Sequence, residues 1–328
     1  MKQNYTPKPK FLERIKLLLN NKEDFKKFIE TSKTRSLKSI RVNTLKTTPE
    51  KLIEKLKQKG WDITQPYQDY PEIIIINTIL KPGELGKTLE HENGYYYVQE
   101  ITSMMPIIAL QPKPGEFLLD LCAAPGSKTT QTASLMQNKG TIIANDMTRT
   151  RTSILSINIQ RLGITNTIIT KENGLKLIEK FKKLNLKFDK ILIDTSCSGE
   201  GTIRTCPQTY QEWSEPLIKS LSGKQKKLTS KALSILKPNG TLLYSTCTYA
   251  PEENEEVIDY LLKNHNLQIQ SITLPIKTRS GLTSWKNKKY NKELKKAVRI
   301  YHQDNNLEGF FLCKLRKLEW ITNQQEPI

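Results

Sequence analysis

The sequence predicts an α/β protein whose main domain contains a parallel sheet with helices on both faces. From about residue 96 onward, short apolar runs alternate with helical stretches. The runs are continuously apolar, as in strands that are buried on both faces. Turn residues separate one element from the next. This regular alternation is typical of a doubly wound, Rossmann-like architecture.

The first 95 residues predict a smaller α+β domain. Pro49 in the first turn and Gly60 after the last turn mark the ends of one helix. The domain is rich in Lys, which suits contact with an RNA backbone, although it could equally be a structural cap on the main domain. The expected elements are a helical stretch at 1–30, a strand at 40–44, a helix at 49–59 and a strand at 72–77.

Residues 96–328 predict the main domain. Its apolar runs are short and bounded by turn residues, and the stretches between them have helical spacing. The expected strands are 117–121, 141–146, 166–172, 190–195, 241–247 and 309–315. The expected helices are 129–137, 148–162, 175–184, 214–236 and 253–265.

The composition points to a polyanionic partner. Lys and Arg total 52 against 33 Asp and Glu, a net charge of +19. Such an excess favours nucleic acid, although a general Lys bias of the source organism would also produce it. No apolar run approaches the ~20 residues that cross a bilayer, and the N-terminal Leu run is too short for a signal peptide. We expect a cytoplasmic protein without a membrane partner.

The cysteines predict chemistry by single thiols. There are five, none of them in a C-x-x-C pair, and only three histidines accompany them. We therefore expect no metal site, and the odd count argues against a disulfide framework. The cysteines are Cys122, Cys197, Cys206, Cys247 and Cys313.

The loop after the first strand of the main domain predicts a cofactor site. The stretch DLCAAPGSKTT, residues 120–130, places small residues before a helix. It lacks both the dinucleotide and the P-loop glycine patterns. Asp146 ends the next strand, where an acid binds ribose hydroxyls in nucleotide-binding folds. An adenosyl ligand without pyrophosphate, such as S-adenosylmethionine, fits these features; alternatively, Asp146 is a helix cap.

Six motifs together resemble the RNA cytosine-5 methyltransferases of the NOL/NOP/Sun class, and the archaeal tRNA enzymes most of all. They are RVNTLK, GYYYVQEITSMMP, DLCAAPGSKTT, DTSCSGEGTIR, YSTCTYAPEENEEV and GFFLCKLRK. The resemblance implies a class I methyltransferase fold with a mostly parallel seven-stranded sheet. It also implies a small N-terminal RNA-binding domain and S-adenosylmethionine as methyl donor.

The resemblance assigns three catalytic residues. Cys247 is the nucleophile that adds to cytosine carbon 6, and Cys197 assists release of the product. Asp194, when protonated, hydrogen-bonds ring nitrogen 3. The cofactor residues that it implies are Cys122, Ala123, Ala124, Pro125, Gly126, Ser127, Lys128, Asp146, Arg151, Asn173 and Asp194.

Two positions depart from the family pattern. Asn173, beside Glu172, stands where an Asp usually meets the adenine; its carbonyl can still accept from the adenine amine. Ser196 replaces the Pro that usually precedes Cys197, which removes a backbone restraint.

Several alternatives stay open. Without the resemblance, Cys247 is a packed core thiol. tRNA is the first expected substrate because no RNA-binding domain is evident beyond the N-terminal one; ribosomal RNA is the second, favoured by Ser196. A non-catalytic RNA-binding assembly factor is a third reading. The acids after Pro251 are expected to begin the next helix. We expect a monomer.

Overall fold

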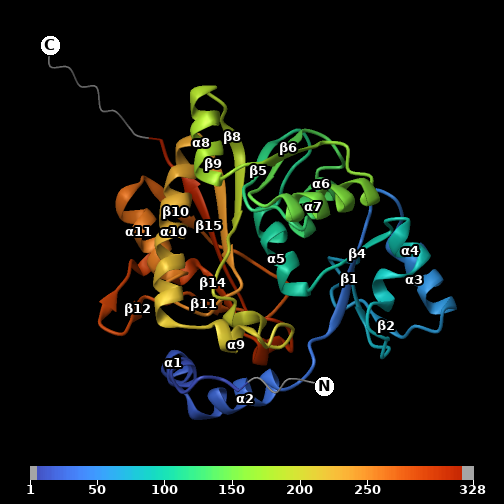
Figure 1. Ribbon diagram of the computed structural model, residues 1–328, viewed down its shortest axis with the longest axis horizontal. Helices are drawn as coiled ribbons and strands as arrows, with labels where there is room; N and C mark the ends of the chain where they lie inside the picture. Colours follow the sequence, from blue (N-terminus) through green and yellow to red (C-terminus); the bar gives the residue numbers. More distant parts are fainter. Residues whose placement is uncertain (1–5, 320–328) are drawn as a thin grey trace.

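The computed structural model describes residues 6–319, and a nine-stranded sheet forms its centre (Figure 1). The strand order is β11-β14-β15-β9-β8-β5-β6-β7, with β10 also paired to β15. The five strands from β5 to β9 pair in parallel, and β15 runs antiparallel between β9 and β14. The strands are β5 (Phe117–Asp120), β6 (Thr141–Asp146), β7 (Thr167–Lys171), β8 (Phe188–Asp194), β9 (Leu236–Thr246), β10 (Leu267–Gln270), β11 (Arg279–Ser280), β14 (Val298–Ile300) and β15 (Phe310–Lys317).

The strand order reverses beside β5. The chain passes from β5 to β6 and β7 on one side, and then returns to β8 and β9 on the other. Ligands bind beyond the carboxyl ends of the strands at such a reversal. The six expected strands are all present, and β14 completes the expected seven; β10 and β11 are short additions at the antiparallel edge.

Helices cover both faces of this sheet (Figure 1). One apolar core lies between the sheet and α5, α6 and α7, and a second lies between the sheet and α8, α10 and α11. The helices are α5 (Ile101–Leu110), α6 (Ser127–Leu135), α7 (Arg149–Leu162), α8 (Gly174–Lys183), α10 (Glu215–Ala232) and α11 (Glu255–Asn264). The shorter elements are α4 (Leu89–Glu92), α9 (Thr209–Glu212), α12 (His302–Asn305), β12 (Ser284–Trp285) and β13 (Lys288–Lys289).

A separate four-stranded antiparallel sheet lies at the right of Figure 1. It combines β1 (Lys38–Val42), β2 (Ile63–Thr64), β3 (Ile73–Ile76) and β4 (Tyr96–Val98), and α3 (Pro49–Gln58) packs on it. As expected, α3 starts at Pro49 and ends just before Gly60. Strand β4 extends this sheet past residue 95, where the domain boundary was expected.

The first two helices belong to a different core from that sheet. Helices α1 (Pro9–Leu19) and α2 (Lys22–Ser32) bury Phe11 and Phe28 against residues of the main domain. The ring centroid of Phe11 lies 5.3 Å from that of Tyr210 and 5.6 Å from that of Trp213. The first 95 residues therefore supply two packing units, of which only the second has a sheet.

The described residues contain neither a membrane-spanning helix nor a cluster of metal ligands. Within residues 6–319, no helix combines the length and apolarity needed to span a membrane. The same residues contain no group of three or more His, Cys, Asp or Glu side chains arranged to hold a metal ion.

Candidate active site

The loop after β5 approaches the carboxyl end of the sheet and turns into α6 at Ser127. Gly126 has φ 107°, in the left-handed region, and an added Cβ would lie 2.9 Å from Leu155 Cδ1. The positive φ favours glycine at this turn, and a side chain here would also displace Leu155. Because Gly126 has no side chain, a ligand can approach the backbone of this loop closely.

Side chains from both parts of the chain donate hydrogen bonds to the carbonyls of this loop. The Arg151 guanidinium donates to Ala124 O at 2.6 Å, and Asn158 Nδ2 donates to Pro125 O at 2.9 Å. Arg41 from β1 donates to Ser127 O at 2.8 Å. The loop is therefore held from the N-terminal sheet as well as from α7.

Arg41 and its neighbour Asn43 fix the small sheet to the main domain. Arg41 is buried and also donates to Thr130 Oγ1 at 2.8 Å; burial lowers its pKa to about 10. Asn43 Nδ2 donates to Gly94 O and to Leu162 O, both at 2.8 Å. The RVNTLK motif is thus a docking segment between the two units.

Asp146 and Asp120 provide carboxylates at the ends of β6 and β5. Asp146 accepts from Thr148 N at 3.2 Å and from Arg151 Nε at 3.1 Å, so it does support the start of α7. Its oxygens retain lone pairs for ribose hydroxyls. Asp120 is 1% exposed; Oδ2 accepts from Thr129, and Oδ1 has no partner among the described residues.

This donor and acceptor set fits S-adenosylmethionine. The unpartnered Asp120 oxygen can accept from an amino group, and the Gly126 turn leaves backbone accessible to a ligand. Burial raises the pKa of Asp120 to about 7. A nearby cationic ligand would favour its charged form. Asp120 was not predicted as a site residue from the sequence, although its position at a strand end next to small residues is typical of one.

Asn173 caps α8 rather than facing the loop freely. Its Oδ1 accepts from Leu175 N at 3.0 Å and from Lys176 N at 3.4 Å. Glu172 beside it forms an ion pair with Lys180 at 2.6 Å. The carbonyl expected to accept from adenine is therefore already used, and an adenine contact of Asn173 stays a prediction.

Burial raises the pKa of the Cys122 thiol, so the cofactor loop does not present it as a reactive thiolate.

The two thiols assigned to catalysis lie together. Cys197 follows β8, Cys247 follows β9, and their Sγ atoms are 3.3 Å apart. The hydrogen bond to Cys247 and burial raise the pKa of Cys197 well above its ordinary value. The two sulfurs are within hydrogen-bond distance, and either of them can be the donor. By contrast, Cys313 is buried in the sheet and Cys206 is exposed.

Asp194 and Lys128 form an ion pair beside the thiols. Lys128 Nζ lies 2.7 Å from Asp194 Oδ2 and is 7% exposed as a residue. Asp194 Oδ1 accepts from Ser245 Oγ at 2.7 Å. Lys128 Nζ also donates to Ser103 Oγ at 2.8 Å and lies 5.3 Å from the Phe310 ring centroid. In this arrangement Asp194 accepts from both Lys128 and Ser245.

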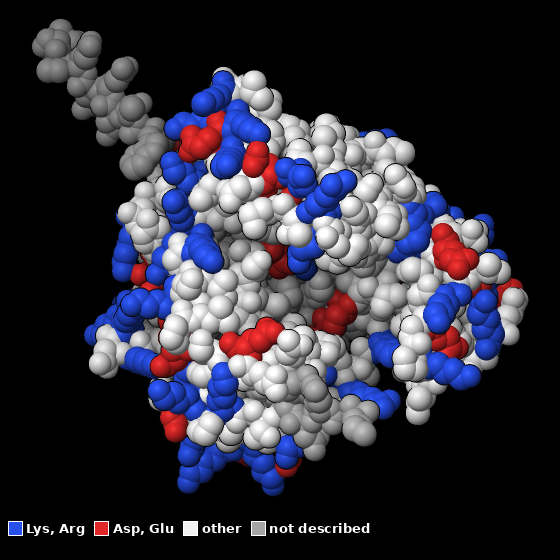
Figure 2. All heavy atoms as spheres, viewed as in Figure 1, with Lys and Arg blue, Asp and Glu red and all other residues white. Residues whose placement is uncertain are grey.

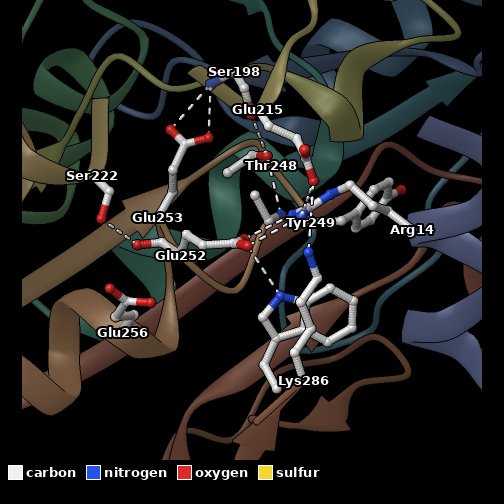
Figure 3. Close-up of polar contacts among 12 residues, drawn as sticks. Arg14, Ser198, Glu215, Ser222, Thr248, Tyr249, Glu252, Glu253, Glu256 and Lys286 are labelled. Carbon is white, nitrogen blue, oxygen red and sulfur yellow. Dashed lines mark hydrogen bonds and ion pairs between the residues drawn. The ribbon is translucent and has the colours of Figure 1, made fainter. Parts of the chain in front are cut away.

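Two of the acids that follow Cys247 bind side chains and backbone of other segments and precede the next helix. Helix α11 begins only at Glu255, whose carboxylate binds Arg299 at 2.6 Å. Figure 3 shows Glu252 pointing to Arg14 and Glu253 pointing to Ser198. The expectation that these acids begin the next helix is wrong for Glu252 and Glu253. Sequence spacing could not reveal their partners, which lie far away in the chain.

Charged side chains are distributed unevenly over one face of the molecule. Figure 2 shows a hollow in the middle of one face, with acidic side chains inside it and Lys and Arg side chains over the surrounding surface. Lys and Arg side chains on this face are therefore exposed to a polyanion.

Family models match both parts of the chain. The model described as 16S rRNA methyltransferase RsmB/F matches residues 107–316. The model of the N-terminal domain of 16S rRNA methyltransferase RsmF matches residues 8–101. The chain belongs to the RsmB/F family. The resemblance read from the motifs is thereby confirmed.

Known relatives of this RsmB/F chain act on different RNAs. A tRNA (cytosine(49)-C(5))-methyltransferase from Pyrococcus abyssi is 39% identical over 85% of this chain and 88% of that protein. Ribosomal RNA small subunit methyltransferase F from Vibrio atlanticus is 35% identical over 97% of this chain. The chain spans 65% of the length of that second relative.

Solved structures confirm the fold of this family member. A methyltransferase homologue from Pyrococcus horikoshii has a TM-score of 0.79 and 34% identity, covering 95% of this chain and all of that one. NSun6 from Pyrococcus horikoshii has a TM-score of 0.81, covers 95% of this chain and 99% of that one, and shares the fold at 24% identity. The predicted class I methyltransferase fold, the enzyme class and S-adenosylmethionine as cofactor are all confirmed for this RsmB/F protein.

Proposed function

We propose that the chain methylates carbon 5 of cytosine in tRNA through a covalent bond between Cys247 and the base. The observation that carries this proposal is the 3.3 Å distance between the Cys247 and Cys197 sulfurs at the same sheet edge as Asp194. Cytosine carbon 5 is a poor nucleophile until a thiolate adds to carbon 6. A pair of adjacent thiols beside a carboxylate supplies both a nucleophile and a partner for its departure.

Cys247 begins the reaction. Its thiolate forms a bond to carbon 6, and Asp194 accepts from the exocyclic amino group of the cytosine. As negative charge develops on the ring, the Lys128–Asp194 ion pair passes a proton to nitrogen 3. Bound S-adenosylmethionine supplies the methyl group, and the residues of the 122–128 loop with Asp146 would hold it.

Release reverses the covalent step. The carbon 5 proton leaves to solvent, the bond between sulfur and carbon 6 breaks, and nitrogen 3 returns its proton to the Lys128–Asp194 pair. Cys197 donates its S–H to the departing Cys247 sulfur and stabilises it as a thiolate. A hydrogen-bonded thiolate is the better leaving group because its charge is partly neutralised.

The tRNA assignment rests on the relatives. The Pyrococcus abyssi tRNA enzyme has the higher identity of the two relatives compared above, and the match covers 88% of its length. Ribosomal RNA is the second candidate, because both family models carry 16S rRNA methyltransferase descriptions and Ser196 occupies the position expected in an rRNA-modifying branch. The alternative of an idle assembly factor is disfavoured by the intact pair of adjacent thiols.

A trapping experiment tests the proposal. Wild type, Cys197→Ala and the double variant Cys197→Ala/Cys247→Ala are incubated with S-adenosylmethionine and either tRNA or 16S rRNA transcripts. We expect methyl transfer by the wild type and a denaturation-resistant protein–RNA adduct with Cys197→Ala. The double variant should form no adduct. Methylation of rRNA alone would select the second candidate, and neither methylation nor adduct with any RNA would disprove the enzyme.

Two further assignments accompany this function. We propose that the protein works as a monomer in the cytoplasm, where RNA substrates and a reducing environment coincide. All five cysteines are free, which suits such an environment. Sedimentation of the purified protein would show about 37.8 kDa if the monomer assignment holds.

A further inference from the structure

The two catalytic thiols lie on separate loops, and strand pairing alone does not hold those loops together. Strand β8 ends at Asp194, three residues before Cys197, and β9 ends at Thr246. The 3.3 Å approach of the two sulfurs must therefore be set by contacts between the loops.

Glu253 binds the backbone directly after Cys197. Its two carboxylate oxygens accept from Ser198 N at 3.3 and 3.1 Å. Gln225 Nε2 donates to Glu253 Oε2 at 2.8 Å and to Ser196 O at 3.0 Å. The peptide groups on both sides of Cys197 are thus bound by Glu253 and its partner Gln225.

The same glutamate is tied to the segment that carries Cys247. Glu253 lies six residues after that thiol, and its own carbonyl accepts from Tyr244 Oη on β9 at 2.6 Å. Ser198 Oγ and Thr248 Oγ1, each next to a catalytic cysteine, are 2.7 Å apart. Glu253 is fully buried, so water does not compete for these hydrogen bonds.

We propose that Glu253 is a positioning residue that fixes the Cys197 thiol against Cys247 through the backbone on either side of Cys197. This inference rests on the proposed function, because it assigns Glu253 to the release step that Cys197 performs. The charge of Glu253 acts in the same direction: after the Cys247 hydrogen bond and burial, it contributes to the raised pKa of Cys197. A protonated, correctly placed Cys197 is what departure of Cys247 requires.

Glu253→Gln tests the proposal with little change in shape. The amide keeps one acceptor oxygen but presents an N–H₂ group to Ser198 N–H or Gln225 Nε2, both of which are donors. We expect kcat to fall roughly tenfold, with the KM for RNA within about twofold, because a buried hydrogen bond in the release step is lost. The protein–RNA adduct should accumulate during turnover.

The decisive comparison is made in the Cys197→Ala background. If Glu253 acts through Cys197, adding Glu253→Gln to Cys197→Ala leaves the rate of adduct formation unchanged. A further fall in that rate would show a general structural role and overturn the proposal. Wild-type turnover without adduct in the single variant Glu253→Gln would also overturn it.

Two controls keep the outcome interpretable. Glu256→Gln changes a nearby acid that pairs instead with Lys226 and Lys288, and it should behave as wild type. If Glu253→Gln fails to bind S-adenosylmethionine in calorimetry, Gln225→Ala replaces it. That variant must then accumulate adduct, or the proposal fails. Absence of any adduct with Cys197→Ala itself would count against the proposed function rather than against Glu253.

Discussion

The cofactor loop and the Cys197 loop lie at the same edge of one sheet, but side chains of opposite character hold them. Side chains from Arg41, Arg151 and Asn158 donate to carbonyls of the cofactor loop. On the Cys197 loop, the carboxylate of Glu253 accepts from the backbone N–H of Ser198. The first loop therefore gains positive charge from its supports, and the second gains negative charge.

This difference suits the chemistry of each loop. Cationic supports favour the carboxylate of a bound amino-acid cofactor, while an anionic support keeps the neighbouring thiol protonated. Lys128 crosses between the two, because it begins in α6 beside the cofactor loop and its ammonium reaches Asp194 beside the thiols. The charge of a support can thus be matched to the protonation state that its loop needs.

Replacing Lys128, which links the two loops, should have the largest effect on the reaction rate. We expect Lys128→Met to lower kcat by about 10³-fold, because it removes the proton donor and the charge that balances the developing anion. Steady-state methyl transfer with the preferred RNA measures this loss. Ser103→Ala, which removes a partner of Lys128 but leaves the ion pair, is the control. A fall of less than tenfold for Lys128→Met would contradict the proton pathway.

Replacing Arg41, a cationic side chain that holds the cofactor loop, should affect the stability of the fold first and the reaction only second. We expect Arg41→Ala to lower the free energy of unfolding by about 3 kcal/mol, since several buried hydrogen bonds are lost together. Urea unfolding monitored by tryptophan fluorescence measures it. Lys55→Ala, at an exposed cation on α3, should cost under about 0.5 kcal/mol. Equal effects of the two variants would show that the docking segment adds no stability.

The buried carboxyl group of Glu253 predicts that the stability of the fold depends on pH. Burial raises the pKa of Glu253 to about 7, above the 4.5 of an exposed Glu. Between these two values the folded protein binds more protons than the unfolded chain, so this group makes stability fall as pH rises. Glu253→Gln removes that contribution. The stability of the variant relative to wild type should therefore increase, by up to about 2 kcal/mol, between pH 4.5 and 7.5. A difference that does not vary with pH would show that Glu253 keeps an ordinary pKa.

The smallest effect on stability is expected at Asn173, the residue that caps α8. Asn173→Ala should lower the free energy of unfolding by about 1 kcal/mol through loss of the α8 cap, and Asn173→Asp should retain it. Calorimetric titration with S-adenosylmethionine separates this role from an adenine contact. An affinity loss above about tenfold in Asn173→Ala would show that the amide does reach the adenine.

Many strands and helices of both domains could be predicted from the sequence because their signals are local. Strand β6 (Thr141–Asp146) coincides with an apolar run that ends at an acid, and α3 starts at its Pro. Helix α5 was not predicted: it is apolar on every side and contains Pro106, so neither a polar face nor helix propensity identifies it. The short edge strands carry too few residues for a pattern.

The candidate site was predicted in its parts but not in its connections. Cys197, Cys247 and Asp194 follow strands, and parallel strands place their ends at one edge, so their meeting was predictable. The ion pair of Lys128 with Asp194 and the bond from Ser198 to Glu253 join side chains 66 and 55 residues apart. Such partners depend on loop conformations that spacing does not encode.

The contact between Arg14 and Glu252 has a consequence for synthesis of the chain. Their charged groups lie 2.7 Å apart, but 238 residues separate them in sequence. At ~5–20 residues per second, Arg14 is synthesised roughly 12–48 s before Glu252. The contacts of helix α1 with Tyr210 and Trp213 can form earlier, but its ion pair with Glu252 cannot. Helix α1 therefore completes its contacts with the main domain only after the segment that follows Cys247 exists.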